Sequence, residues 1–241
     1  MKYIASCSGG KDSVATLLLA KIHNEPLDEV VYCEVMFDKN TSGEHPKHRD
    51  FIYNKLKPFV ELEIGVPFKI VRSEKTYEDV FYTKVSRGKN EGKYLTFPIP
   101  GMCRINKDCK IPPIRKYWKS FEEDVTQYVG IAVDEPKRLT RLNNTNQVSL
   151  LAKYNYTEEM AKQLCVKYDL LSPIYELITR NGCWFCFNNP DKAWSDLIVN
   201  YPELFGELER LDNSVDDSEK YRKCLTRTET VIELKSRLLQ K

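Results

Sequence analysis

The sequence predicts an α/β protein built on a doubly wound, mainly parallel sheet, with a helical C-terminal extension. Two observations support this fold class: apolar runs of strand length alternate with segments of helical periodicity, and a glycine-containing loop joins the first strand to the first helix. This order is typical of parallel sheets, because parallel strands need long connections that are usually helices. We expect residues 1–195 to form the α/β domain and residues 196–241 to form the extension.

Each expected element rests on its own pattern of apolar residues. The run from Val30 to Phe37 is almost continuously apolar, as in a strand that is buried on both faces. Strands are expected over residues 3–6, 30–37, 68–71 and 126–133, and helices over residues 14–22, 51–56 and 114–121. In the extension, two stripes at helical spacing predict helices that pack onto the core: Leu204, Leu208 and Leu211, then Val231, Leu234 and Leu238.

The composition limits the kinds of partner that the whole chain favours. Basic side chains number 37 and acidic side chains 35, and the resulting net charge of +2 gives no general case for a polyanion-binding protein. No apolar run reaches the length of a membrane span, and the first predicted strand follows Met1 without a signal peptide. We therefore expect a cytoplasmic protein with no membrane partner.

The run SGGKDS, here called the phosphate loop (residues 8–13), lies between the first strand and the first helix. Its glycines let the backbone turn tightly and approach an anion, and the helix that follows presents unpaired amide groups and a favourable dipole. The run matches neither a Walker loop nor a GxGxxG fingerprint. An ordinary strand-to-helix turn is the alternative. The predicted nucleotide-binding residues of the loop are Ser8, Gly9, Gly10, Lys11, Asp12 and Ser13.

Two further loops are expected beside the phosphate loop, since ligands of such sheets bind beyond the carboxyl ends of the strands. Asp38 follows the second predicted strand, and Glu135 and Arg138 follow the fourth. The carboxylates are predicted to hold Mg²⁺ between phosphate oxygens, and the guanidinium to bind phosphate in a bidentate manner. For Glu135 and Arg138, a solvated helix start at Pro136 is an equally weighted alternative.

Two pairs of cysteines are candidate metal ligands. One pair lies in PGMCRINKDCKIPP and the other forms a CxxC in NGCWFCFNNP, where glycine and asparagine suggest a tight turn. Four thiolates can close a zinc site or hold a [4Fe-4S] cluster, and the spacing does not choose between them. A redox dithiol or unliganded thiols are the alternatives. The predicted ligands are Cys103, Cys109, Cys183 and Cys186.

SGGKDS resembles the PP-loop of the ATP pyrophosphatase, or adenine nucleotide alpha hydrolase, superfamily, whose pattern is SGGxDS. Together with DKNTSGEHP, CKIPPI, GIAVDEPKR and GCWFC, the motifs between about residues 1 and 195 look like its phosphoadenosine phosphosulfate reductase-like branch. The resemblance implies a Rossmann-like, adenine nucleotide alpha hydrolase-like fold. Relatives that insert sulfur into DNA carry an iron-sulfur cluster, which the resemblance places on the same four cysteines.

The resemblance also implies a reaction. ATP would be cleaved between its α- and β-phosphates, AMP would be transferred to an acceptor, and sulfur would then displace AMP. Lys11 and Asp12 are the predicted catalytic residues. Lys11 with Mg²⁺ would neutralise the leaving pyrophosphate, and Asp12 would orient the loop through backbone amides, with metal binding as the alternative. The acceptor is a nucleic acid or a small metabolite, and a sulfur donor protein is a further expected partner. Basic and aromatic residues that could receive a polynucleotide are Lys110, Arg115, Lys116, Tyr117 and Trp118, although a solvated helix with aromatic residues in the core is the favoured interpretation.

Two departures from the family pattern bear on the alternatives. Reductases of the branch use a nucleophilic C-terminal cysteine beside Gly and His, whereas Cys224 lies in YRKCLTRTE, with neither neighbour. In addition, Ala132 stands at a position where many relatives carry Arg. A sulfonucleotide reductase is therefore the second hypothesis, and a non-catalytic nucleotide-binding module the third.

Overall fold

The computed structural model describes residues 1–98, 103–179 and 182–240. The chain divides into two compact units, and each unit is assembled from three segments of the sequence. Unit 1 comprises Met1–Cys33, Pro46–Val71 and Pro113–Tyr175, and unit 2 comprises Glu34–His45, Arg72–Pro112 and Glu176–Lys241.

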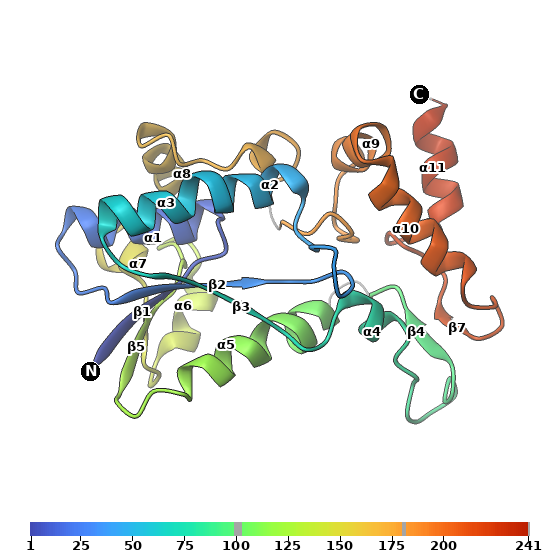
Figure 1. Ribbon diagram of the computed structural model, residues 1–241, viewed down its shortest axis with the longest axis horizontal. Coiled ribbons are helices and arrows are strands. Elements are labelled where there is room, and N and C mark those ends of the chain that lie inside the picture. Colours follow the sequence, from blue (N-terminus) through green and yellow to red (C-terminus); the bar gives the residue numbers. More distant parts are fainter. Residues whose placement is uncertain (99–102, 180–181, 241) are drawn as a thin grey trace. The chain divides into compact units, whose positions relative to one another are not determined.

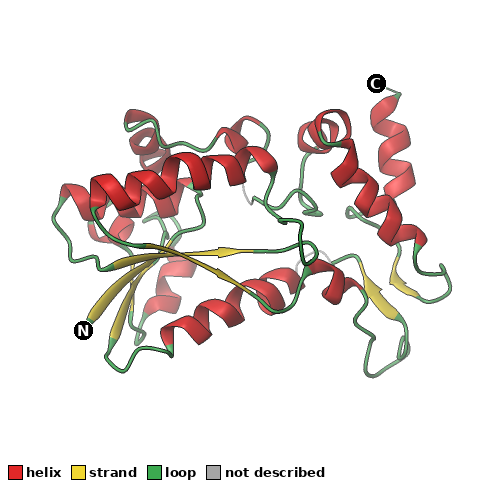
Figure 2. Cartoon of the chain, viewed as in Figure 1, coloured by secondary structure: helices red, strands yellow, loops and turns green. Residues whose placement is uncertain are grey.

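Unit 1 is built on a five-stranded sheet, which confirms the predicted α/β class (Figure 2). β1 pairs in parallel with β2 and with β5, and β5 pairs in parallel with β6. The strands β2 and β3 follow β1 on one side of it, and β5 and β6 lie on its other side. The direction of strand addition therefore reverses between β1 and β5. The strands are β3 (Phe68–Arg72), β2 (Glu29–Glu34), β1 (Lys2–Ser6), β5 (Val125–Tyr128) and β6 (Gln147–Val148), in spatial order.

Helices cover both faces of this sheet (Figure 1). α1 (Lys11–Ile22) is buried almost all round, and it packs with α7 and α8 into the core on one face, while the part of α5 that belongs to unit 1 lies on the other face. The remaining helical elements of unit 1 are α2 (Pro46–Phe51), the π-helical η1 (Ile52–Leu56), α3 (Lys57–Phe59), the π-helical η2 (Val60–Ile64), α6 (Pro136–Leu139), η4 (Thr140–Leu142), α7 (Leu150–Lys153), α8 (Glu158–Lys167) and η5 (Pro173–Glu176).

Three predicted elements end elsewhere in the structure. β2 stops at Glu34 instead of Phe37, because the chain turns back there and the amide of Phe37 donates to the carbonyl of Thr41. β5 stops at Tyr128 rather than at residue 133, since the loop that follows runs against the start of α1. The helix predicted over 114–121 is α5 (Ile111–Trp118), preceded by the π-helical η3 (Asn106–Lys110).

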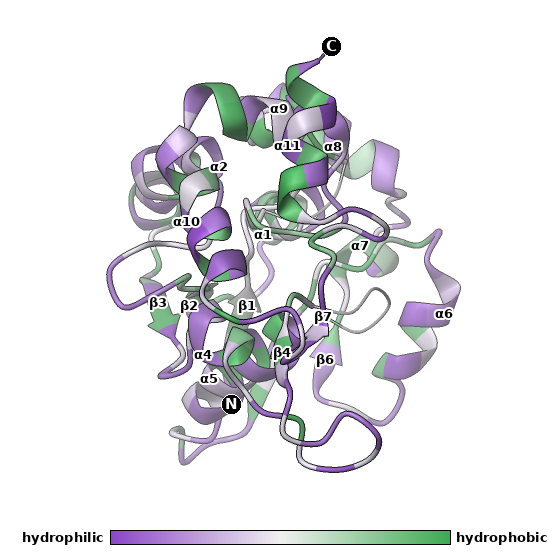
Figure 3. Cartoon of the chain, turned by 90° about the vertical axis from the view of Figure 1, so that its right-hand side faces the viewer, coloured by the Kyte–Doolittle hydropathy of each residue, from purple (hydrophilic) through white to green (hydrophobic). Residues whose placement is uncertain are grey.

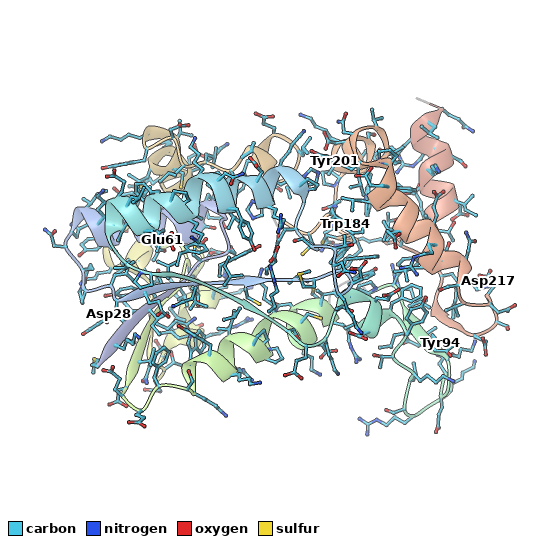
Figure 4. The ribbon with its side chains drawn as sticks, viewed as in Figure 1. Asp28, Glu61, Tyr94, Trp184, Tyr201 and Asp217 are labelled. Carbon is cyan, nitrogen blue, oxygen red and sulfur yellow. The ribbon has the colours of Figure 1, made fainter. Side chains whose placement is uncertain are left out.

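Unit 2 has its own aromatic core, which includes Phe37, Tyr77 and Trp184. Trp184, labelled in Figure 4, donates its indole N–H to the carbonyl of Ser42 at 2.8 Å. α4 (Tyr77–Phe81), α9 (Asp191–Asn200), α10 (Pro202–Asn213) and α11 (Val231–Leu239) surround this core, and β4 (Tyr94–Thr96) pairs in parallel with β7 (Lys220–Arg222).

The segment predicted as an extension is largely helical. α11 begins with a capping box between Thr230 and Glu233, and its hydrophobic and hydrophilic stretches are visible in Figure 3. The predicted domain division at residue 195 stays a prediction; α9 spans this position. Within the described ranges, every helix is too short or too polar to cross a lipid bilayer.

Candidate functional site

The phosphate loop directly follows β1, at the point where the strand order of the sheet reverses. Gly9 has a left-handed φ of +75°, and a Cβ at this position would come within 2.8 Å of Ile52 Cγ1, so both conformation and packing require glycine. Gly10 is the N-cap of α1 and makes no side-chain cap. The first amides of α1 are therefore left for another acceptor.

Gly130, in the loop after β5, lies against this helix start. A Cβ on Gly130 would come within 2.7 Å of the carbonyl carbon of Asp12 and of the amide nitrogen of Ser13. The two loops at the reversal point thus touch through their backbones, as expected where an α/β sheet binds a ligand. Gly130 opens the motif GIAVDEPKR, but it fell inside the strand predicted over residues 126–133 and was not singled out as a site residue.

The Ser13 hydroxyl is used within the loop. It donates to the carbonyl of Gly10 at 2.8 Å and accepts the amide of Ser8 at 3.2 Å, and Ser13 is only 8% exposed. The thiol of Cys7 lies 3.5 Å from the same oxygen. In this structure Ser13 therefore holds the loop in shape, and its predicted contact with phosphate stays a prediction.

Lys11 and Asp12 form an ion pair at the start of α1. Lys11 Nζ lies 2.8 Å from Asp12 Oδ1 and 3.5 Å from Glu158 Oε2. Burial raises the pKa of Asp12, the ammonium of Lys11 opposes this rise, and the carboxylates of Glu158 and Glu135 add to it. The predicted catalytic pair is thus close together, and the Asp12 carboxylate accepts a hydrogen bond from Lys11 Nζ.

Tyr175 contacts the phosphate loop from η5. Its hydroxyl accepts the backbone amide of Lys11 at 2.8 Å, and a Cβ on Gly10 would come within 3.3 Å of the same oxygen. Burial raises the pKa of Tyr175 to about 12, so the hydroxyl keeps its proton at neutral pH. No feature of the sequence indicated this contact, because the partners are 164 positions apart.

His48 also contacts the phosphate loop, and the sequence analysis did not identify it. Its ring is 3% exposed, with Nε2 3.0 Å from the carbonyl oxygen of Ser8 and Nδ1 2.8 Å from the hydroxyl of Ser172. Because a carbonyl only accepts, Nε2 carries the hydrogen in this arrangement. The imidazole therefore fixes the first residue of the phosphate loop.

Glu135 and Arg138 lie in unit 1 at the start of α6. The Glu135 carboxylate accepts from Arg138 Nη1 at 2.7 Å and from the amide of Ala132 at 3.3 Å. This is the geometry of the predicted alternative, a charged helix start, although Glu135 is near enough to Asp12 to affect its pKa. Both residues stay predictions as nucleotide ligands.

Asp38 belongs to unit 2. Its carboxylate accepts the amides of Asn40 at 2.7 Å and Thr41 at 2.6 Å, which closes the turn after β2. Burial acts to raise the pKa of Asp38, but these amide hydrogen bonds outweigh it and the pKa is lowered overall. Its place in the nucleotide site stays a prediction.

All four cysteines of the predicted metal site belong to unit 2. The amide of Cys186 donates to the carbonyl of Cys183 at 3.3 Å, so the CxxC forms a tight turn, as the sequence predicted. Cys109 is fully buried and its thiol donates to the carbonyl of Thr76 at 3.5 Å. Cys103 is exposed, and its sulfur accepts the amide of Asn106 at 3.4 Å.

The start of α4 lies among these sulfur atoms. The hydroxyl of Tyr77 is buried and has no hydrogen-bond partner among the described residues. Burial raises its pKa, and three sulfur atoms are near enough to raise it further, those of Cys186, Cys103 and Cys183. Burial also raises the pKa of Cys183 itself, with smaller contributions from Cys186 and Cys103. Cysteines of both pairs thus influence the same buried hydroxyl group.

The chemistry of this set fits zinc or an iron-sulfur cluster, since soft thiols lie beside an apolar core and a hydroxyl is available to donate to sulfur. Among the described His, Cys, Asp and Glu side chains, however, no three are arranged to hold a metal ion as they stand. The four-cysteine ligand set stays a prediction.

Comparisons with known proteins add little to this picture. No protein-family model matches the chain, and no curated protein matches it. Among solved structures, the chain is similar to a U34-tRNA thiolase, NcsA from Methanococcus maripaludis with its [4Fe-4S] cluster, at 17% identity and a TM-score of 0.44, over 99% of this chain and 81% of that chain. A likeness at this level carries no argument about the site, so the inferences below rest on the residues described above.

Proposed function

We propose that the chain is an ATP-using enzyme of the PP-loop type, which cleaves ATP between the α- and β-phosphates and adenylates an acceptor for sulfur insertion. One observation carries the proposal: a complete SGGKDS loop lies at the reversal point of a parallel sheet, and Gly130 lies against the same helix start. Parallel sheets bind nucleotides at such a point. The choice of the bond between the α- and β-phosphates rests on the resemblance of SGGKDS to the PP-loop.

Lys11 would change partners when nucleotide binds. Its ammonium forms ion pairs with the carboxylates of Asp12 and Glu158. Phosphate oxygens would replace these carboxylates, and the amides of the first turn of α1 would bind the same group. The charge that develops on the leaving pyrophosphate would then be neutralised by groups already in position.

Asp12 and Glu135 are the carboxylates that we propose for Mg²⁺. The carboxylate of Glu135 contributes to raising the pKa of Asp12, and oxygen is the ligand that Mg²⁺ prefers. Mg²⁺ commonly takes only one or two protein carboxylates, with phosphate oxygens and water completing its shell. Such a site forms with the nucleotide and does not need three carboxylates beforehand.

The cysteines Cys103, Cys109, Cys183 and Cys186 would hold a [4Fe-4S] cluster or zinc in unit 2. When bound, a cluster supplies a site that can carry sulfur. The acceptor would be a nucleic acid or a small metabolite, and an external protein would supply the sulfur. Tyr77 would orient the set by donating its buried hydroxyl to sulfur.

The nucleotide is tested by thermal unfolding of anaerobically purified protein with Mg-ATP and, separately, with phosphoadenosine phosphosulfate. A ligand at a hundredfold excess over its Kd stabilises the fold by about 2.7 kcal/mol. We expect selective stabilisation by Mg-ATP, its loss in Lys11→Ala, and its retention in Lys21→Ala at the other end of α1. Selective stabilisation by the sulfonucleotide would replace the proposal with a reductase. Binding of ATP without pyrophosphate release in the presence of candidate acceptors would favour a non-catalytic module.

The metal is tested by analysing iron and zinc in the anaerobic protein and in two cysteine variants. Cys183→Ser is expected to lose bound metal, whereas Cys224→Ser, outside the predicted set, is expected to keep it. Full metal content in Cys183→Ser would overturn the four-cysteine proposal. Iron with a broad visible absorption would identify a cluster, and zinc alone would identify a structural site.

A further inference from the structure

A pocket of about 600 Å³ opens on unit 1 at the amino ends of β5 and β6. Val125 and Gln147, the first residues of these strands, line it, whereas the phosphate loop follows the last residue of β1. The pocket reaches along β5 as far as Gln127, and none of its lining residues belongs to the phosphate loop. The pocket is lined by Arg115, Trp118, Lys119, Glu123, Asp124, Val125, Gln127, Thr145, Asn146 and Gln147.

Part of the pocket wall is a ladder of amide side chains. Gln147 Nε2 donates to Gln127 Oε1 at 2.5 Å, and Gln127 Nε2 donates to Ser6 Oγ at 2.7 Å, which joins three neighbouring strands. On the other face of the same strands, Ala5 and Tyr128 pack into the apolar core. The ladder holds the polar groups of this wall in fixed positions, beside a lining that is otherwise mainly apolar, as is usual for a ligand pocket.

The opposite wall comes from the end of α5 and supplies an aromatic ring and two cations. The indole nitrogen of Trp118 is buried and lacks a hydrogen-bond partner among the described residues. Arg115 and Lys119 are exposed, and neither forms an ion pair with any described side chain. Two acids also line the pocket, Glu123, which is paired with the amino group of Met1 at 2.7 Å, and Asp124. The end of α5 therefore brings two exposed cations and an indole to the same pocket.

We propose that this pocket binds one nucleotide unit, with its base stacked on Trp118 and its phosphate on Arg115 and Lys119. Amide side chains such as that of Asn146 pair well with base edges, and indole rings stack on bases of any sequence. A simple anion would use the cations alone and leave the ring and the amides unused. The ligand is either a free mononucleotide or one nucleotide of a single-stranded nucleic acid, which share this chemistry.

This site is separate from the phosphate loop and does not depend on the reaction proposed there. It also revises the favoured interpretation of the α5 residues from the sequence. Tyr117 follows that interpretation, because its hydroxyl donates to the carboxylate of Glu29 inside unit 1. Trp118 departs from it, since its ring forms a pocket wall instead of filling the core.

Tryptophan fluorescence reports on this pocket, because Trp184 and Trp194 are each 1% exposed while Trp118 borders the cavity. The full-length protein would be titrated with AMP and with a single-stranded RNA hexamer. We expect a change in fluorescence that is absent in Trp118→Leu. That variant should bind roughly tenfold to a hundredfold more weakly, because it loses base stacking. Trp118→Phe keeps an aromatic face and should retain most of the affinity.

The double variant Arg115→Glu/Lys119→Glu should weaken binding at least about tenfold, by loss of phosphate contacts. Its control, Lys162→Glu/Lys167→Glu, makes the same charge change on exposed positions of α8 and should bind as the wild type does. Equal thermal unfolding of both double variants shows that the fold is intact. Binding of the hexamer with strong salt dependence, and not of AMP, identifies a polynucleotide; equal binding of AMP identifies a free nucleotide.

The phosphate loop could also bind AMP, so Lys11→Ala is titrated in parallel. Binding that survives in Lys11→Ala and is lost in the Arg115/Lys119 variant supports the second site. Binding that is lost in Lys11→Ala and unchanged in the Arg115/Lys119 variant, or no binding of either probe, would overturn the proposal.

Discussion

The backbone amide of Lys11 donates a hydrogen bond of 2.8 Å to the hydroxyl of Tyr175. This amide is the first of α1, and Gly10 offers it no side-chain cap. The phenolic oxygen therefore occupies a donor that a phosphate oxygen would use in a nucleotide complex. Tyr175 thus acts as an internal acceptor at the phosphate loop.

Tyr175→Phe removes this acceptor and keeps the ring. We expect the free energy of unfolding to fall by about 1 kcal/mol, and the affinity for Mg-ATP to rise about fivefold because the Lys11 amide no longer exchanges partners. Calorimetric titration measures the affinity, with Tyr168→Phe on the exposed end of α8 as the control. Weaker binding in Tyr175→Phe would instead mean that the hydroxyl helps to hold the nucleotide.

Gly130→Ala places a Cβ within 2.7 Å of backbone atoms of Asp12 and Ser13. Backbone cannot move aside as a flexible side chain can, so we expect a loss of about 1–3 kcal/mol in stability and a clear loss of nucleotide binding. Gly206→Ala is the control, because a Cβ there meets nothing within 4 Å and the position lies within α10. This control should gain about 0.5–1 kcal/mol. Equal stability of the two variants would contradict the contact between the β5 loop and α1.

His48→Ala removes a buried ring that bonds the carbonyl of Ser8 and the hydroxyl of Ser172. The lost packing and hydrogen bonds should cost about 2–4 kcal/mol, and the folded fraction should bind nucleotide more weakly because the loop is no longer fixed. His23→Ala removes an exposed ring that stacks on Tyr154, and a cost below about 1 kcal/mol is expected. Chemical denaturation compares the two, and a His48 variant as stable as the His23 variant would refute the supporting role.

Cys165 should make the fold sensitive to alkali. Its thiol donates a hydrogen bond to the carbonyl oxygen of Lys11, with the sulfur 3.2 Å from that oxygen. Burial raises the pKa of this thiol from the ordinary 9.0 to about 12. Between these two values the unfolded chain has lost a proton that the folded chain keeps, so the free energy of unfolding falls as pH rises and is unaffected below the lower value. Cys165→Ala lacks this term. Its stability difference from the wild type should therefore shrink between about pH 8 and about pH 10.5, as measured by urea unfolding; parallel curves would contradict the prediction.

Features that depend on neighbours in the chain were predictable. β1 and α1 lie on either side of the phosphate loop as expected, because apolar periodicity and a glycine pair are local signals. The turn at Cys183 and Cys186 is local in the same sense. The ends of β2 and β5 were predicted too late, because apolar composition continues past the points at which a turn and the start of α1 stop strand pairing.

The sequence by itself determined the alternation of strands and helices and the chemistry offered by residues 8–13. Tertiary structure alone decided which distant groups serve that loop. Tyr175 reaches Lys11 across 164 positions and His48 reaches Ser8 across 40. Contacts at such separations follow from the order of the strands and the packing of helices onto them, and neither periodicity nor spacing within one sequence specifies that arrangement.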